Sequence, residues 1–480
     1  MKAKLFSFSF LGVCLAIASG TKTAQASSLT TLATGLNNPV GLSFGPEGNI
    51  YVGETGIGGD GNCQPSPSTQ FELICAGNTG SITRVSLDGG QERILDGYDS
   101  LALEVSKEQG AGPQQLSFDA NGNAYLITGY AGNPGNRDLE LNNLAQDIEY
   151  PAEQELIAPV VPPEEVLGTS TLGHLYQVDL ETGDLTDIVD LSKLELLDNP
   201  DGGDYISNPF KLLIEDDTAY VSDGGANVVW EVELDSGETT ATPFPRRTVE
   251  NPIFPPQLPG SDASNEPDLP PGGQPGQNAI PGVPAAQEAP PDGPAPEQIP
   301  FELALQSVTT GIDFGPDGAL YVGEYSGFPY PEGQARIFRV GEDGVPEVYA
   351  DGFTQIVDLA FDEDGNLLVL QFAEESQWKY NDGNSIRDLP SSLIQLAPDF
   401  TRTTLIDGDE GLLSATDLLV SDDNEIYVTN RGAGAGIGEV VRVDRDRRNS
   451  SQSVPEPSSI IGLVAFAALG IVLDSKPKDK

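Results

Sequence analysis

Oxygen-bearing side chains recur at one place in six copies of a single sequence pattern. Each copy has a short apolar strand, a turn rich in Gly, Asp and Asn, and a second apolar strand. The residues that end the second strands are Glu54, Thr128, Asp223, Glu324, Gln371 and Asn430. The positions that open the first strands add Asn38, Asn208, Asp358 and Asp417. Carboxylate and amide oxygens are the ligands that Ca²⁺ prefers.

If the copies surround an axis, these oxygens converge at one mouth of a central channel. We therefore predict a calcium site there, with Glu54, Asp223, Glu324, Asn430 and Asn208 as ligands. The alternative is that these groups bind channel water and cap strand ends. Two further acidic stretches, DEDGN (362–366) and DNPDGGD (198–204), look calcium-like, but each is also a simple turn.

An aromatic loop follows the second strand of the fourth copy. The run EYSGFPYPEG carries Tyr325, Phe328 and Tyr330, and Arg336 lies in the next strand. Such a loop beside a channel mouth can stack on a planar aromatic ligand. We name these four residues as candidate ligand contacts, with self-packing of the loop as the alternative.

Catalytic motifs are scarce in this sequence. The one histidine, His174, falls in the middle of an expected strand, away from the predicted mouth, which favours a structural role. The sequence contains no GxSxG, HExxH or phosphate-binding loop. A hydrolase would therefore have to work with carboxylates and metal-bound water.

The repeats themselves predict the fold. A hairpin with one apolar face cannot bury that face alone, so the copies must pack on one another. The six copies span 39–54, 113–128, 209–223, 309–324, 356–371 and 415–430. Two more strands follow five of them, and 28–36 can supply the strand that the sixth lacks. We predict an all-β, six-bladed β-propeller over 27–446, whose N-terminal strand closes the last blade.

Both ends of the chain predict export. Residues 1–26 have the basic, apolar and small-residue regions of a cleavable signal peptide. In an oxidising compartment, Cys63 and Cys75 are expected to form a disulfide. The Pro-rich stretch 244–300 cannot bury enough apolar surface to fold, so we expect a disordered insertion.

The C-terminal region has a Pro-Glu-Pro motif, an apolar run and a lysine-containing end. This order over 454–480 resembles the PEP-CTERM sorting signal. The resemblance implies a hydrophobic sorting helix, transient membrane association and an exosortase-type enzyme as partner. The formal net charge of −50 argues against nucleic acid as a partner, since phosphates would be repelled.

Several segments resemble the ScyD/ScyE family of cyanobacterial proteins, named after the gene cluster for the pigment scytonemin. They include GLNNPVGLSFGPEGNIYVGETGIGGDGNC, NPDGGDYISNPFKLL and GPDGALYVGEYSGFPYPEGQARIFRV. The resemblance implies a periplasmic or extracellular role near pigment maturation, and it supplies no catalytic residues. We therefore expect a surface-associated module that binds a small aromatic ligand or a protein partner. The alternative is a Ca²⁺-dependent, lactonase-like hydrolase.

Overall fold

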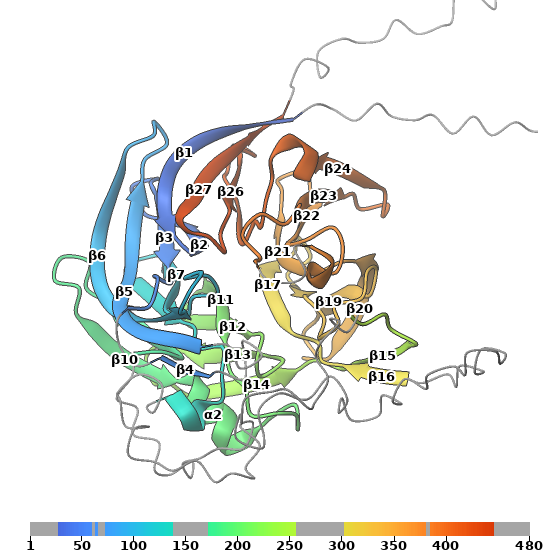
Figure 1. The fold of residues 1–480 in the computed structure, drawn as a ribbon, viewed down its shortest axis with the longest axis horizontal. Helices are drawn as coiled ribbons and strands as arrows, with labels where there is room; N and C mark the ends of the chain where they lie inside the picture. The colour runs from blue at the N-terminus through green and yellow to red at the C-terminus, as the bar shows by residue number, and fades with distance from the viewer. Residues whose placement is uncertain are drawn as a thin grey trace, which may run out of the picture. The chain divides into compact units, whose positions relative to one another are not determined.

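Six antiparallel sheets, which we call blades 1 to 6, surround one axis (Figure 1). The structure is a computed structural model, and it describes residues 27–59, 63–65, 73–137, 171–255, 302–380 and 385–445. This arrangement confirms the predicted six-bladed β-propeller. A second unit, residues 445–480, is described only at Arg445.

Each blade consists of four strands, and blade 1 gains a short fifth strand. Blade 1 contains β2 (Pro39–Phe44), β3 (Ile50–Glu54), β4 (Cys63–Pro65), β5 (Leu73–Val85) and β6 (Gln91–Leu103). Blade 2 contains β7 (Pro113–Phe118), β8 (Ala124–Thr128), β9 (His174–Val178) and β10 (Leu185–Asp190). Blade 3 contains β11 (Pro209–Glu215), β12 (Thr218–Asp223), β13 (Val228–Glu233) and β14 (Thr239–Pro243).

The second half of the ring repeats this order. Blade 4 contains β17 (Thr309–Phe314), β18 (Leu320–Glu324), β19 (Ala335–Val340) and β20 (Pro346–Phe353). Blade 5 contains β21 (Ile356–Phe361), β22 (Leu367–Gln371), β23 (Ser392–Leu396) and β24 (Arg402–Ile406). Blade 6 contains β25 (Leu418–Val420), β26 (Ile426–Asn430), β27 (Ala435–Asp444) and β1 (Ser28–Asn37).

The first strand of each blade lies innermost. The strands β2, β7, β11, β17, β21 and β25 contact one another in this order, and β25 returns to β2. Figure 1 shows most of their labels toward the centre, with β6, β10, β20 and β24 farther out. Apolar clusters fill the seams between neighbouring blades, as where Leu36 and Val440 meet Leu42 and Val52. Stability therefore comes from burying each blade's faces against its neighbours.

The N-terminal strand closes the ring, as predicted. β1 pairs with β27 along its length, from Ser28 opposite Asp444 to Leu36 opposite Gly438. The two ends of the propeller thus share one sheet. The pairing covers β27 on both sides, and β1 becomes the outer strand of blade 6.

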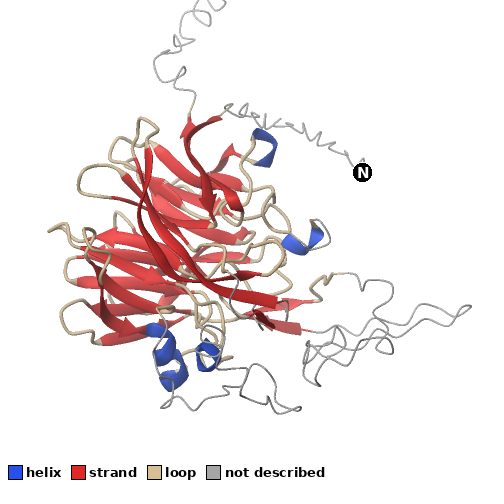
Figure 2. Cartoon of the chain, turned by 60° about the vertical axis from the view of Figure 1, so that its left-hand side comes forward, coloured by secondary structure: helices blue, strands red, loops and turns tan. Residues whose placement is uncertain are grey.

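The connections between strands are of two kinds, short and long, and the two kinds lie at opposite edges of the blades. Those from the first to the second strand and from the third to the fourth are tight turns. Those from the second to the third strand, and from the fourth to the next blade, are mostly longer. We call the edge with the longer connections the loop face. Its connections hold α2 (Leu191–Asp198), η2 (Pro134–Asn136), η5 (Gln377–Lys379) and η7 (Gly408–Glu410), which lie outside the sheets (Figure 2).

The predicted boundary of the Pro-rich insertion is wrong at its N-terminal side. Phe244 is buried against blade 4, and β15 (Arg247–Glu250) pairs with β16 (Glu302–Leu305). An apolar contact and a two-stranded ladder therefore order residues that composition alone assigned to disorder. Residues 256–300, the signal peptide 1–26 and the sorting segment 454–480 lie outside the described residues.

Among the residues that the structure describes, no helix is long and apolar enough to cross a membrane.

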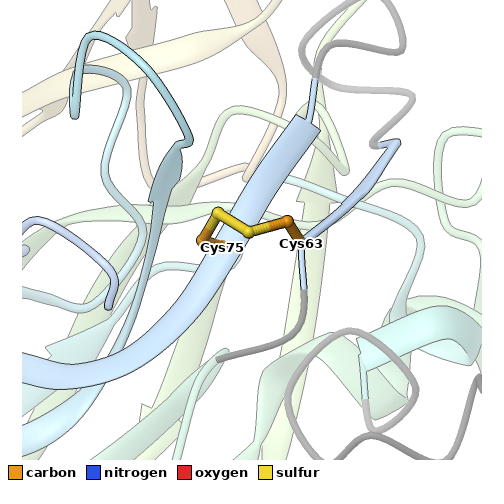
Figure 3. The surroundings of a disulfide bond; sticks show 2 residues. All are labelled: Cys63 and Cys75. Carbon is orange, nitrogen blue, oxygen red and sulfur yellow. A yellow bond between two sulfur atoms is a disulfide. The ribbon is translucent and has the colours of Figure 1, made fainter. Parts of the chain in front are cut away.

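Cys63 and Cys75 form the predicted disulfide (Figure 3). Cys63 lies in β4 and Cys75 in β5, and the two residues are direct partners in the ladder. The bond closes a loop between cysteines twelve positions apart in blade 1. It thereby ties β4, which lies within the connection that follows β3, to the start of β5.

The double substitution Cys63→Ala/Cys75→Ala should lower the free energy of unfolding by about 2–3 kcal/mol, because it frees a loop in the unfolded chain. Urea denaturation of the oxidised proteins measures the loss. Dithiothreitol should bring the wild-type protein to the level of the variant and leave the variant unchanged. Equal stabilities under oxidising conditions would contradict this assignment.

Candidate functional site

The third residue of each sequence repeat lies beside the axis. Because the repeats are equivalent, these residues have the same place in their blades. They are Gly41, Gln115, Lys211, Gly311, Asp358 and Asp417. Two glycines, one amide, one ammonium and two carboxylates thus face the centre of the ring. We call this set the axial residues.

Lys211 joins blade 3 to blades 5 and 6. Its Nζ donates to Asp358 Oδ2 at 2.7 Å and to Asp417 Oδ1 at 2.6 Å. The three residues are 8%, 0% and 2% exposed. Burial lowers the pKa of Lys211, but the two carboxylates raise it above its usual value. The lysine is therefore a cation at neutral pH.

The other carboxylate lone pairs bind backbone N–H groups of neighbouring blades. Asp417 Oδ2 accepts from Leu42 N, and Asp358 Oδ2 accepts from Leu418 N, both at 2.8 Å. Gln115 makes the equivalent bond from blade 2, accepting from Leu212 N at 2.7 Å. Burial, and after it the neighbouring Asp358, raise the pKa of Asp417 well above its usual value, and Lys211 opposes that shift. Since both oxygens of Asp417 accept N–H groups, we describe it as a carboxylate.

Glycine at the two remaining axial positions makes room for this network. A Cβ on Gly311 would lie 2.5 Å from both Cα and Oδ1 of Asp358. One on Gly41 would lie 2.5 Å from the carbonyl oxygen of Gln114. Because real Cβ atoms do not approach other atoms so closely, side chains there would push neighbouring innermost strands apart.

The predicted oxygen ring at the channel mouth is wrong. The residues that end the second strands turn toward their own blades, and several cap the N–H groups of the loop entering the first strand. Asn37 N donates to Glu54, Asn208 N to Asp223, and Leu413 N to Asn430. Gln371 accepts from Thr354 N in the same way, and Thr128 donates to the Thr171 carbonyl.

The three predicted carboxylate ligands already have protein partners. Glu54 accepts from Arg93 at 2.9 Å and from the Thr83 hydroxyl at 2.5 Å. Glu324 receives Nε and Nη2 of Arg336 at 2.8 and 2.6 Å. Burial raises the pKa of Glu324, and Arg336 opposes that shift.

Asp223 is a fully buried capping residue. It accepts backbone N–H groups from Asn208, Gly225 and Ala226, and its other oxygen accepts from Ser207 and Trp230. Burial raises its pKa against the pull of these donors. Asn208 contributes its backbone N–H, and its side-chain oxygen receives a 3.4 Å bond from Gln114.

The predicted calcium ligands are not brought together. Within the described ranges, one trio of acidic, histidine or cysteine ligand atoms lies within reach of a single ion. It is Cys63, Cys75 and Glu104, and both sulfurs are in the disulfide. At the axis, Asp358 and Asp417 already share the ammonium of Lys211. The axial donors therefore do not fit a resident calcium ion.

The aromatic loop is largely packed on itself and on blade 5. Tyr325 donates to Gln377 at 2.6 Å, and Trp378 Nε1 donates to the Pro329 carbonyl at 2.8 Å. Tyr330 contacts both Tyr325 and Phe328 edge to face. Burial raises the pKa of Tyr325 well above its usual value. Of the predicted contacts, Phe328 is the exposed one, at 38%.

The guanidinium of Arg336 is already paired with protein groups, so it does not offer a free positive charge to a ligand. Besides Glu324 it donates to the Pro245 carbonyl at 2.8 Å, and its guanidinium lies 4.7 Å from the Phe338 ring centre. The arginine thus fixes the start of the segment after β14. His174 is similarly structural: its Nδ1 lies 2.8 Å from Asp187, and its ring stacks on Tyr176.

Lys211 was missed by reasoning from the sequence, although a signal exists. In the repeat alignment, PFKLLIE of blade 3 carries its lysine where IVDLAF and ATDLLV carry Asp358 and Asp417. Opposite charges at equivalent positions of different blades point to a pair across the axis. Aligning the charges within first strands would have found it.

Glu195, also missed, is a buried acid that is 0% exposed. Among the residues that the structure describes, neither of its carboxylate oxygens has a hydrogen-bond partner and no cation pairs with it. On the same face of α2, Ser192 bonds Ser207, which donates to Asp223. Burial first, and then the charges of Asp223 and Asp201, raise the pKa of Glu195 to about 9. The side chain is therefore a neutral acid at pH 7.

Solved structures that resemble the chain are propeller proteins at low identity. No protein-family model matches the sequence, and no curated protein matches it. A glucose dehydrogenase is 12% identical, with a TM-score of 0.42 over 87% of this chain and 99% of that one. A putative gluconolactonase is 10% identical, with a TM-score of 0.40 over 88% and 92%.

A calcium-binding protein, regucalcin from Agrobacterium tumefaciens, is also 10% identical. Its TM-score is 0.40, and the match covers 87% of this chain and 95% of that one. These likenesses are too distant to assign an activity to this chain.

Glu195→Gln should stabilise the protein and flatten its pH dependence. The folded pKa lies above the unfolded one, so stability due to this group is lost as pH rises from about 4.5 toward 9. An amide stays neutral, so we expect a gain of roughly 2 kcal/mol at pH 8 and little at pH 4. Thermal unfolding across pH measures it, with exposed Glu238→Gln as the control. Parallel pH profiles for E195Q and wild type would refute this interpretation.

Proposed function

We propose that this chain is a β-propeller that binds a ligand or partner on its loop face, rather than an enzyme that works in its channel. The observation that carries the proposal is the axial ion pair. Lys211, Asp358 and Asp417 bond to one another across the ring, and each is at most 8% exposed. A substrate entering the channel would have to displace a buried ammonium from two carboxylates, which is costly.

The loop face instead offers a surface whose loops are held together by hydrogen bonds. Connections from separate blades meet on it: Glu108, after β6, accepts from the Ser385 hydroxyl at 2.9 Å and from Ile386 N at 3.1 Å. In the same way, Gln377 of blade 5 bonds Tyr325 and Gln355. Loops braced against each other can hold binding side chains in fixed positions.

Phe328 is the proposed contact for a planar aromatic ligand. Its ring contacts Tyr330 at 5.7 Å and Phe254 at 5.9 Å, between ring centres. The neighbouring Pro329 carbonyl is held by Trp378. A pre-ordered, half-open ring loses little conformational entropy when a second ring packs on it. The carboxylate-rich sequence favours a neutral or cationic ligand.

The proposal includes the cellular setting that the sequence suggests. Support comes from the disulfide, which persists in oxidising compartments. Export remains a prediction from the signal-peptide pattern of residues 1–26. Exosortase sorting, transient membrane association and a link to scytonemin-type pigment maturation remain predictions from resemblance. The competing hypothesis, a Ca²⁺-dependent hydrolase, would need axial carboxylates free of Lys211.

Phe328→Ala should weaken binding of an indolic or phenolic probe about tenfold, because it removes one face of the stacking contact. Calorimetric titration with N-acetyltryptophanamide and N-acetyltyrosinamide measures the change. Phe400→Ala is the matched control, since Phe400 is 53% exposed in the tight turn between β23 and β24, away from the loop face.

Binding unchanged in F328A, or weakened equally in F400A, would argue against this site. Hydrolysis of a lactone that stops with EDTA and in Asp358→Asn would instead support the hydrolase.

A further inference from the structure

The axial residues contain a buried cation that the chain supplies itself. Asp358 and Asp417 belong to adjacent blades, and each has an oxygen within 2.7 Å of the same Nζ. Lys211 reaches them from blade 3, across the ring. Two carboxylates this close and this buried repel each other, and a cation between them relieves that repulsion.

The backbone donors alone cannot provide that neutralisation. The N–H groups of Leu42, Leu359 and Leu418 satisfy hydrogen-bonding positions on the two carboxylates, but they carry no net charge. Among the described residues, the ion pairs of Asp358 and Asp417 are those with Lys211. In the part of the chain that the structure describes, the ammonium is therefore the one formal positive charge bonded to the pair.

The Nζ position also has the geometry of a cation site. Its distances to Asp358 and Asp417 are 2.7 and 2.6 Å, which lie at the upper end of the range of about 2.3–2.6 Å that Ca²⁺ takes with oxygen. Shortening the side chain at 211 would leave a space between two carboxylates, lined by the equivalent positions of the other blades. Glycine at 41 and 311 adds no side chain to that space.

We propose that the ε-ammonium of Lys211 is the axial cation of this propeller and makes the ring independent of metal. Removing it turns Asp358 and Asp417 into a divalent-cation site. The wild-type chain then needs no calcium to hold its blades together. The same carboxylates become calcium ligands when the internal cation is absent.

The test compares thermal unfolding of wild type, Lys211→Ala and Lys211→Met in two buffers. One contains EDTA, and the other contains about 5 mM CaCl₂, a concentration above a millimolar dissociation constant. We expect wild type to unfold at the same temperature in both buffers. K211A should unfold at least about 5 °C lower in EDTA, and calcium should restore most of the loss. K211M, which fills the space with an apolar chain, should be destabilised and recover much less.

Controls separate this site from other calcium effects. Lys211→Ala/Asp417→Asn should lose the recovery, and Lys379→Ala, a surface lysine paired with Glu332, should behave as wild type. Calorimetric titration of CaCl₂ should show one added site in K211A. If K211A does not fold in EDTA, the variant Lys211→Arg, which keeps a positive charge, replaces it in the test. A K211R protein that folds in EDTA supports the proposal, and one that does not fold there contradicts it.

Three results would overturn the proposal. They are a K211A protein as stable as wild type in EDTA, a K211A protein that calcium does not stabilise, and a wild-type protein whose unfolding temperature depends on calcium through Asp358. None of these outcomes depends on whether Phe328 binds an aromatic ligand.

Discussion

The arrangement of the blades depends on one buried ammonium placed between two carboxylates. Lys211 crosses the ring from blade 3, and Asp358 and Asp417 receive it from blades 5 and 6. Asp417 then binds the backbone of blade 1, where the ring closes. Its neighbour Thr416 likewise donates to the Pro39 carbonyl. The β1–β27 ladder fixes the outer side of the closing blade, and this network fixes the inner ends of the same junction.

This ion pair separates two parts of the molecule. The axial residues stabilise the fold, and the loop face is available for binding. The centre contains charges that satisfy one another, so it serves stability and specificity of the fold. The tight-turn face has short connections. The loop face carries the longer connections, where bonds such as Glu108 to Ser385 join distant blades. Binding on a face, with an ion pair across the axis, lets this architecture vary its ligands without weakening its core.

The fold was predictable from the sequence, whereas the site was not. Alternating apolar residues and Gly-Asp turns recur in every blade, and 28–36 matches the missing strand, so topology and closure follow from local pattern. The direction in which a side chain points at the end of a strand does not follow from that local pattern. Glu54, Asp223 and Glu324 stand where an axial ring was expected, but the N–H groups of the entering loop and Arg336 turn them into their own blades.

Lys211 and Glu195 show the same limit of local pattern. The partners and burial of these two residues depend on which blades face each other across the ring or along a seam. No single repeat contains that information. Disorder in the Pro-rich insertion was overestimated at Phe244 for a similar reason, since its burial partner Phe338 lies far along the chain.

The most direct measurement is a crystal structure of the wild-type protein grown with millimolar calcium, with anomalous scattering recorded at the axis. The account predicts Lys211 Nζ between Asp358 and Asp417 and no anomalous peak there. A calcium peak bonded to both carboxylates, with Lys211 displaced, would contradict it.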